Sequence, residues 1–245
     1  MSDLKVAFIT GAARRIGATI TRTLHHEGYR VIVHHNHSSE EARALVQELN
    51  QIRTGSAVSL QADLSVMNEI KPLAEKAISA FGHIDLLVNN ASSFYPTPLE
   101  SSTQEHWDDL ISSNLRAPYF LCSALSETLK ARKGCIINMI DIHAQRGLPG
   151  HPIYSIAKAG LQMMTLSLAK ELAPLVRVNG VSPGPILWPE SDKPEEQKQE
   201  ILNQTLLQKT GEAQDIADAV VYLSKAAFVT GQVLAVDGGK SLYSH

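Results

Sequence analysis

Tyr154 and Lys158 are the two side chains whose types and spacing most clearly suggest chemistry. They lie four residues apart in a segment that is expected to be helical, so they share one face. A free phenol has a pKa of about 10 and is a poor acid at neutral pH, but a neighbouring ammonium stabilises the phenolate and lowers that pKa. The spacing predicts an acid–base pair, although such pairs are also common on helix surfaces.

Asp141 stands 13 residues before Tyr154 and directly follows an apolar run at residues 135–140. A carboxyl group at the end of a buried strand is partly desolvated, and in that position it could pass a proton. The alternatives are an exposed loop acid or a helix cap.

A turn of small residues, Thr-Gly-Ala-Ala-Arg-Arg-Ile-Gly, occupies residues 10–17 after the first apolar run. In doubly wound sheets, such a turn opens a helix whose free N–H groups bind the pyrophosphate of a dinucleotide. Arg14 and Arg15 would lie at the positive end of that helix, so an anion should compensate them. The alternative is two solvated arginines on a surface helix.

The end of the second predicted strand favours NADP(H) over NAD(H). Sites for NAD usually place an acid there for the ribose 2′-hydroxyl, whereas residues 33–39 of this chain contain no carboxylate and the next acid is Glu40. Arg14, His37 and Ser38 could donate to a 2′-phosphate instead. The clustered histidines lack a companion thiolate or carboxylate at ligand spacing, so no metal is expected.

Short apolar runs alternate with amphipathic stretches along the whole chain, which is typical of a parallel sheet covered by helices. The predicted strands are residues 6–10, 31–34, 57–61, 86–89, 135–139, 177–181 and 233–236. The expected fold is a single α/β domain over residues 1–245, with a Rossmann-like doubly wound sheet. A long helical stretch at residues 104–132 should kink or divide at Pro118.

The composition is that of an ordinary globular protein. Among 245 residues, 44% are hydrophobic, and the net charge is -3 without a basic stripe, so neither nucleic acid nor an anionic membrane surface is an expected partner. There is no signal-peptide pattern and no apolar run long enough to cross a bilayer, which favours a cytoplasmic location. The two cysteines lie in predicted helix and strand and imply no disulfide.

The chain resembles the short-chain dehydrogenase/reductase family over essentially its whole length. The resemblance rests on motifs that occur in the same order in that family: the glycine-rich turn, Asn89-Asn90-Ala91, Asn114, Tyr154 with Lys158, and Pro183-Gly184. The resemblance implies hydride transfer from NADPH, with Tyr154 as proton donor, Lys158 holding the ribose, Asn114 supporting a proton relay, and a homotetramer. The cofactor-binding residues that it implies are Gly11, Arg14, Arg15, Ile16, His37, Ser38, Asp63, Leu64, Asn90, Ala91, Tyr154, Lys158, Pro183 and Gly184.

At two positions the chain differs from the usual pattern of this family and resembles its pteridine reductase branch. Arg15 stands where a second glycine is usual, and Asp141 stands where most members carry a serine. The run Ser92-Ser93-Phe94-Tyr95-Pro96 is also similar to that branch, with Phe94 stacking on a pterin and Ser92 bonding to it. The implied substrate-binding residues are Arg15, Ser92, Phe94, Asp141, Tyr154, Leu187 and Trp188.

Residues 185–208 form the expected substrate flap, with an ordinary solvated surface helix as the alternative. The substrate remains open between a dihydropterin, an oxidised pterin and dihydrofolate. Two other functions are possible from the sequence: a general carbonyl reductase, such as one acting on 3-oxoacyl groups, and a non-catalytic NADP(H)-sensing protein. Asp141 in place of a serine argues against the carbonyl reductase. The presence of Tyr154 and Lys158 argues against a non-catalytic protein.

Overall fold

All seven predicted strands are present in the computed structural model, which describes residues 4–186 and 194–243. They form one parallel sheet in the order β3-β2-β1-β4-β5-β6-β7. The strands are β1 Val6–Ile9, β2 Arg30–His35, β3 Ala57–Gln61, β4 Leu86–Asn89, β5 Cys135–Met139, β6 Arg177–Pro183 and β7 Val233–Val236. The doubly wound α/β fold expected from the sequence is therefore confirmed.

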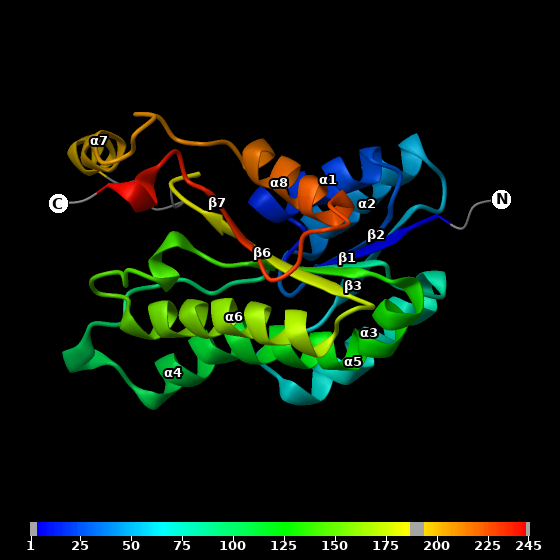
Figure 1. Cartoon of the computed structure of the whole chain (residues 1–245). Helices are drawn as coiled ribbons and strands as arrows, with labels where there is room; N and C mark the ends of the chain where they lie inside the picture. The colour runs from blue at the N-terminus through cyan, green and yellow to red at the C-terminus, as the bar shows by residue number, and fades with distance from the viewer. Residues whose placement is uncertain (1–3, 187–193, 244–245) are drawn as a thin grey trace.

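Helices cover both faces of the sheet, as Figure 1 shows: α1, α2 and α8 lie on one face, and α3, α4, α5 and α6 on the other. The helices are α1 Arg15–His26, α2 Ser39–Ile52, α3 Met67–Phe81, α4 Gln104–Ile111, α5 Ala117–Arg132, α6 Pro152–Glu171, α7 Glu195–Asn203 and α8 Ala213–Lys225. Because both faces are covered, the central strands β1, β4 and β5 are buried along their whole length, whereas the edge strands β3 and β7 are buried only in part.

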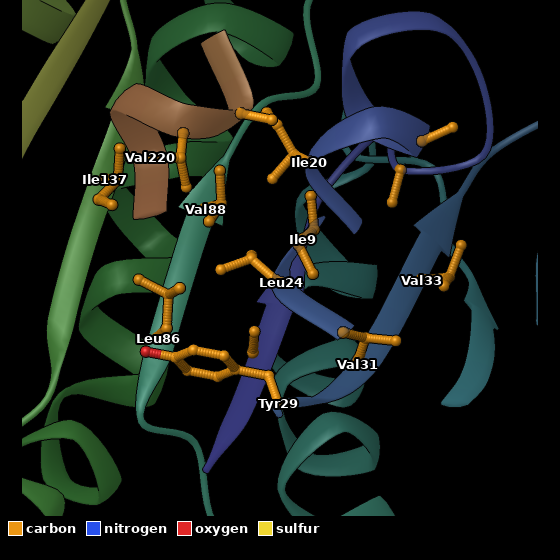
Figure 2. Packing of buried hydrophobic residues seen from close by; sticks show 14 of the residues in the cluster. Ile9, Ile20, Leu24, Tyr29, Val31, Val33, Leu86, Val88, Ile137 and Val220 are labelled. Atoms are coloured by element: carbon orange, nitrogen blue, oxygen red, sulfur yellow. The ribbon is translucent and has the colours of Figure 1, made fainter. Parts of the chain in front are cut away.

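Ile16, Ile20 and Leu24 recur every four residues in the sequence, a spacing that predicts a helix with one apolar face, and in α1 that face packs on the sheet. Ile20 and Leu24 are fully buried, and Figure 2 shows them packed among Ile9, Val31 and Val88 of the strands. Each such side chain contributes roughly 1.5–3 kcal/mol relative to an exposed one. This packing fixes the start of α1, and with it the glycine-rich turn, against the end of β1.

The stretch around Pro118 divides as expected, but the irregularity lies just before the proline. A π-helical segment, η2 Ser112–Arg116, joins α4 to α5, and Pro118 is the second residue of α5. Proline is tolerated in a first helical turn, where its missing N–H is not needed. The wide turn carries Asn114, which is completely buried.

The carboxyl ends of β1, β4, β5 and β6 meet at one edge of the sheet. The strand order reverses between β1 and β4, because β1 leads outward to β2 and β3 while β4 leads to β5, β6 and β7. In open α/β sheets, ligands bind in the crevice at this switch point. The turn after β1, Asn90 after β4, Asp141 after β5 and Pro183 at the end of β6 all lie at this edge.

Candidate active site

Two adjoining cavities open at this edge of the sheet. The larger has a volume of about 890 Å³, and the smaller one about 620 Å³. Arg15, Ile16, Asn90 and Ser92 line both, so the two form a continuous site. The larger cavity is also lined by Phe94, Asp141, Tyr154, Lys158, Pro183 and Gly184. The smaller is also lined by Gly11, Arg14, His37, Ser38, Asp63, Leu64 and Ala91.

Asp141 and Tyr154 form a hydrogen-bonded pair in the larger cavity. The tyrosine hydroxyl donates to Asp141 Oδ2 over 2.9 Å. The other carboxylate oxygen, Oδ1, accepts from the backbone N–H of His143 at 2.8 Å and caps the short 3₁₀ helix Ile142–Ala144. Asp141 can therefore cap the 3₁₀ helix and contact Tyr154 at the same time, because each interaction uses a different carboxylate oxygen.

Lys158 lies beneath Tyr154 on the same face of α6, as the spacing predicts. Its ammonium donates to the Met139 carbonyl at 2.9 Å and lies 5.5 Å from the centre of the Tyr154 ring. Burial lowers the pKa of Lys158 to about 8, an effect that the nearby Asp141 carboxylate partly opposes.

The expected lowering of the tyrosine pKa is wrong for this arrangement of side chains. Burial, and then the charge and hydrogen bond of Asp141, raise the pKa of Tyr154 well above that of an ordinary tyrosine. The spacing of Tyr154 and Lys158 could not reveal this, because both causes come from outside their helix. Tyr154 therefore keeps its proton at neutral pH.

Ser92 connects this pair to the buried Asn114. The serine hydroxyl donates to Asn114 Oδ1 at 2.6 Å. Ser92 also lowers the Tyr154 pKa, the smallest of the effects on it and one that opposes the rise caused by burial and Asp141. The Asn114 amide donates to the carbonyls of Ser93 and Leu110 at 2.9 and 3.0 Å. Asn114 itself does not line either cavity among the described residues, and it contacts the site by its hydrogen bonds to Ser92 and Ser93.

The glycine-rich turn is packed tightly against the residues that follow β4. Gly11 has a φ of +59°, and a Cβ there would lie 2.9 Å from the Cα of Ala91. The Asn90 amide donates to the carbonyls of Thr10 and Gly11, while the Thr10 hydroxyl accepts from the N–H groups of Asn90 and Ala91. These contacts hold the start of α1 at the junction of the two cavities.

Arg15 adopts the left-handed backbone conformation that glycine favours, with a φ of +51°. Glycine, which the family resemblance implies at this position, would adopt this conformation without a side-chain penalty. A side chain in this region costs roughly 1–2 kcal/mol, and such strain is concentrated at functional sites. Arg15 is exposed and lines both cavities, so its cation lies where two ligands would meet.

The smaller cavity brings together the groups predicted to receive a 2′-phosphate. Arg14, His37 and Ser38 line it, and Arg14 Nη1 lies 4.0 Å from a carboxylate oxygen of Glu41. Hydrogen bonds from Ser65 lower the pKa of Asp63 against the opposing effect of burial, and the Asn36 side chain adds to this lowering. Asp63 is therefore an acceptor within the cavity.

Phe94 lies on the loop after β4 and forms a wall of the larger cavity. Its ring is half exposed and meets the Tyr154 ring edge to face, with centroids 4.8 Å apart. The same ring is stacked flat on His151, at 4.7 Å and an interplanar angle of 7°.

The expected flap is described only in part. Leu187 and Trp188 lie outside the described residues. Helix α7 has no buried residue, which matches the alternative of a solvated surface helix. Ile201 in this helix and Gln204 directly after it nevertheless line the larger cavity.

Several residues of the site were missed by sequence reasoning. Arg146, Lys240 and Tyr243 line the larger cavity, and Arg146 donates to the carbonyls of the other two at 3.1 and 2.6 Å. Arg146 lies 94 residues from Lys240 and 97 from Tyr243 in the chain, so only the fold shows its proximity to them. His34 accepts from the Gly11 N–H at 3.1 Å, and burial lowers its pKa to about 4, so it is a neutral structural group.

The described residues contain no group of three or more His, Cys, Asp or Glu side chains that could hold a metal ion. Over the same part of the chain, no helix has the length and apolar character needed to cross a membrane.

Comparison with known proteins supports a family assignment. Residues 11–241 match the family described as enoyl-(acyl carrier protein) reductase. The chain is 37% identical to pteridine reductase 1 of Leishmania tarentolae, covering 97% of this chain and 96% of that protein. It is also 37% identical to a 3-oxoacyl-(acyl-carrier-protein) reductase of Staphylococcus aureus, over 98% and 99% of the two chains. The fold, the edge of the sheet that carries the site and these matches together show that the chain belongs to the short-chain dehydrogenase/reductase family of oxidoreductases.

Proposed function

We propose that this protein is an NADPH-dependent pteridine reductase that reduces a dihydropterin to its tetrahydro form. The observation that carries the proposal is the hydrogen bond from the Tyr154 hydroxyl to Asp141. A reduced C=N bond needs a hydride at carbon and a proton at nitrogen, and this pair can supply the proton. The cytoplasmic location and the homotetramer expected from the sequence belong to the same proposal.

The cavities suit a dinucleotide with an additional phosphate. Gly11 and the first residues of α1 line the smaller cavity, so the start of this helix is available to a pyrophosphate, and Arg14, His37 and Ser38 in the same cavity could bind a 2′-phosphate. NADPH, when bound, supplies the hydride. Lys158, buried at the bottom of the larger cavity, would hold the ribose next to Tyr154.

The proton moves along named atoms in this proposal. Tyr154 gives its hydroxyl proton to the ring nitrogen of the pterin. The Asp141 carboxylate holds no proton of its own, so it first takes one from solvent and then passes it to the Tyr154 phenolate, which burial and the adjacent negative charge disfavour. Asp141 is only partly buried, so it can take up the replacement proton from solvent. Ser92 and Asn114 hold the hydroxyl network in place.

A 3-oxoacyl reductase is the second candidate, because relatives of that kind are as similar to this chain as the pteridine reductase is. Reduction of a ketone builds negative charge on its oxygen, and a hydroxyl group stabilises that charge by donating to it. A carboxylate at position 141 would repel it instead. Asp141 therefore favours a pterin over a ketone as the substrate.

A substrate panel tests the proposal. NADPH oxidation would be followed with dihydropterin, dihydrofolate, oxidised pterin, a 3-oxoacyl thioester and simple ketones. We expect turnover with dihydropterin and at most weak turnover with the ketones and the thioester. The reverse preference would reject the proposal, and firm NADPH binding with no turnover of any substrate would favour the sensing protein.

A further inference from the structure

We infer that His151 is a positioning residue for substrate binding, because its imidazole supports the Phe94 ring against which the substrate would stack. The inference rests on the proposed function, in which Phe94 offers a flat surface to the pterin. It assigns a role to a residue that the proposed proton path does not use.

The contact between the two rings has the geometry of a stacked pair. Their planes differ by 7° and their centroids are 4.7 Å apart, whereas Phe94 and Tyr154 meet edge to face at 78°. Offset or parallel stacking of this kind is favourable beyond the area that it buries. Phe94 is thus held by a flat contact with His151 and an edge contact with the proposed proton donor.

His151 contacts Phe94 from outside the cavity. Phe94 lines the larger cavity, whereas His151 is not among the described residues that line either cavity. Phe94 remains half exposed despite its contacts with His151 and Tyr154, so part of its ring is available to a ligand. His151 therefore acts on a ligand through Phe94 and not by touching it.

The His151 imidazole also contacts a backbone carbonyl. Its Nδ1 lies 3.0 Å from the Pro149 carbonyl oxygen, and His151 directly precedes Pro152, the first residue of α6. A residue before proline has a restricted backbone. Because α6 also carries Tyr154, His151 ties the position of Phe94 to the helix of the proposed proton donor.

Hydrogen bonds of the residues that follow Phe94 anchor its loop, while the ring remains half exposed. The Thr97 N–H donates to the Gly150 carbonyl at 2.7 Å, and the Tyr95 hydroxyl donates to Asp109 at 2.8 Å. These bonds fix the loop backbone, while rotation of the Phe94 side chain is limited mainly by its ring contacts. Without the imidazole, more rotamers become accessible, and binding must restrict them again.

Three substitutions separate stacking from the other properties of His151. His151→Gln keeps a polar group that can reach the Pro149 carbonyl but removes the ring. His151→Leu keeps an apolar side chain of similar size without a flat face. His151→Phe keeps a flat ring and removes the hydrogen bond. For each variant, kcat and the KM values for dihydropterin and NADPH would be measured, with NADPH affinity as the check on folding.

We expect the Gln and Leu variants to raise the KM for dihydropterin by up to about tenfold, the effect of losing one aromatic pair. Their kcat and their NADPH affinity should stay near the parent values, and His151→Phe should keep the parent KM. Unchanged KM in the Gln and Leu variants, or an equal rise in the Phe variant, would overturn the inference. A parent enzyme inactive on dihydropterin would instead reject the proposed function, and this inference with it.

Discussion

The Tyr154 hydroxyl donates to Asp141 Oδ2 over 2.9 Å, and the second oxygen of that carboxylate is held at 2.8 Å by the His143 N–H. The carboxylate is therefore fixed in orientation by its cap while it faces the tyrosine. With its pKa raised by burial and by Asp141, Tyr154 is protonated throughout the neutral range. The proton is therefore present on Tyr154 at neutral pH, and under the proposed function a bound substrate receives it and Asp141 relays its replacement from solvent.

Replacing Tyr154 by phenylalanine should remove the donor while keeping the ring that meets Phe94. We expect turnover of dihydropterin to fall by about 10²-fold or more, the usual scale of a proton-transfer group. NADPH affinity should change little and can be measured by fluorescence titration. Near-parent turnover would remove Tyr154 from the chemistry.

Lys158 should set an alkaline limit to activity. Burial lowers its pKa to about 8, so its ammonium loses its proton as the pH rises through that value. Tyr154 stays protonated over the same range, because its pKa is much higher. We expect kcat/KM for NADPH to fall above about pH 8, and a Lys158→Met variant to be weakly active without this step. A profile that stays flat to pH 10 in the parent would contradict the account.

Replacing Lys158 by methionine should also stabilise the fold. The lowered pKa means that the unfolded chain binds the Lys158 proton more tightly than the folded chain, so the protonated lysine destabilises the fold at pH 7. A change from 10.5 to about 8 corresponds to roughly 3 kcal/mol, from which the lost bond to Met139 subtracts about 1 kcal/mol. Lys158→Met should raise the free energy of unfolding in urea at pH 7, and the gain should shrink between pH 8 and 10. A less stable variant would argue against this reading.

Cofactor preference provides a test of the smaller cavity. We expect kcat/KM with NADPH to exceed that with NADH by at least about tenfold, or 1.4 kcal/mol. Asn36→Asp should narrow or reverse the ratio, because a carboxylate repels the 2′-phosphate. Since Asn36 also bonds to Asp63, Asn36→Ala is the matched control that loses this bond without adding charge. Equal use of both cofactors by the parent would contradict the assignment.

The sequence predicted the elements well because their signals are local. The apolar runs gave all seven strands, and the four-residue repeat of Ile16, Ile20 and Leu24 gave α1. The glycine-rich turn and Asn90 came together because parallel strands end at one edge. The contacts that tune the site could not be predicted: the Tyr154 pKa depends on burial and on Asp141, and the stack of Phe94 on His151 joins two loops 57 residues apart.

The central claim is that Asp141 adapts the family's proton-donating tyrosine to a pterin. Asp141→Asn keeps the size and much of the hydrogen bonding of the side chain but cannot cycle a proton, so it should lower dihydropterin turnover by about 10²-fold or more. NADPH binding should survive in this variant, which makes it the control for correct folding of the site.

The most direct measurement compares Asp141→Ser with the parent at saturating NADPH, using dihydropterin and a 3-oxoacyl thioester in parallel. The account predicts that the serine variant loses pterin turnover by a similar factor of about 10² and gains weak reduction of the ketone. A serine variant that reduces dihydropterin as fast as the parent would contradict the account.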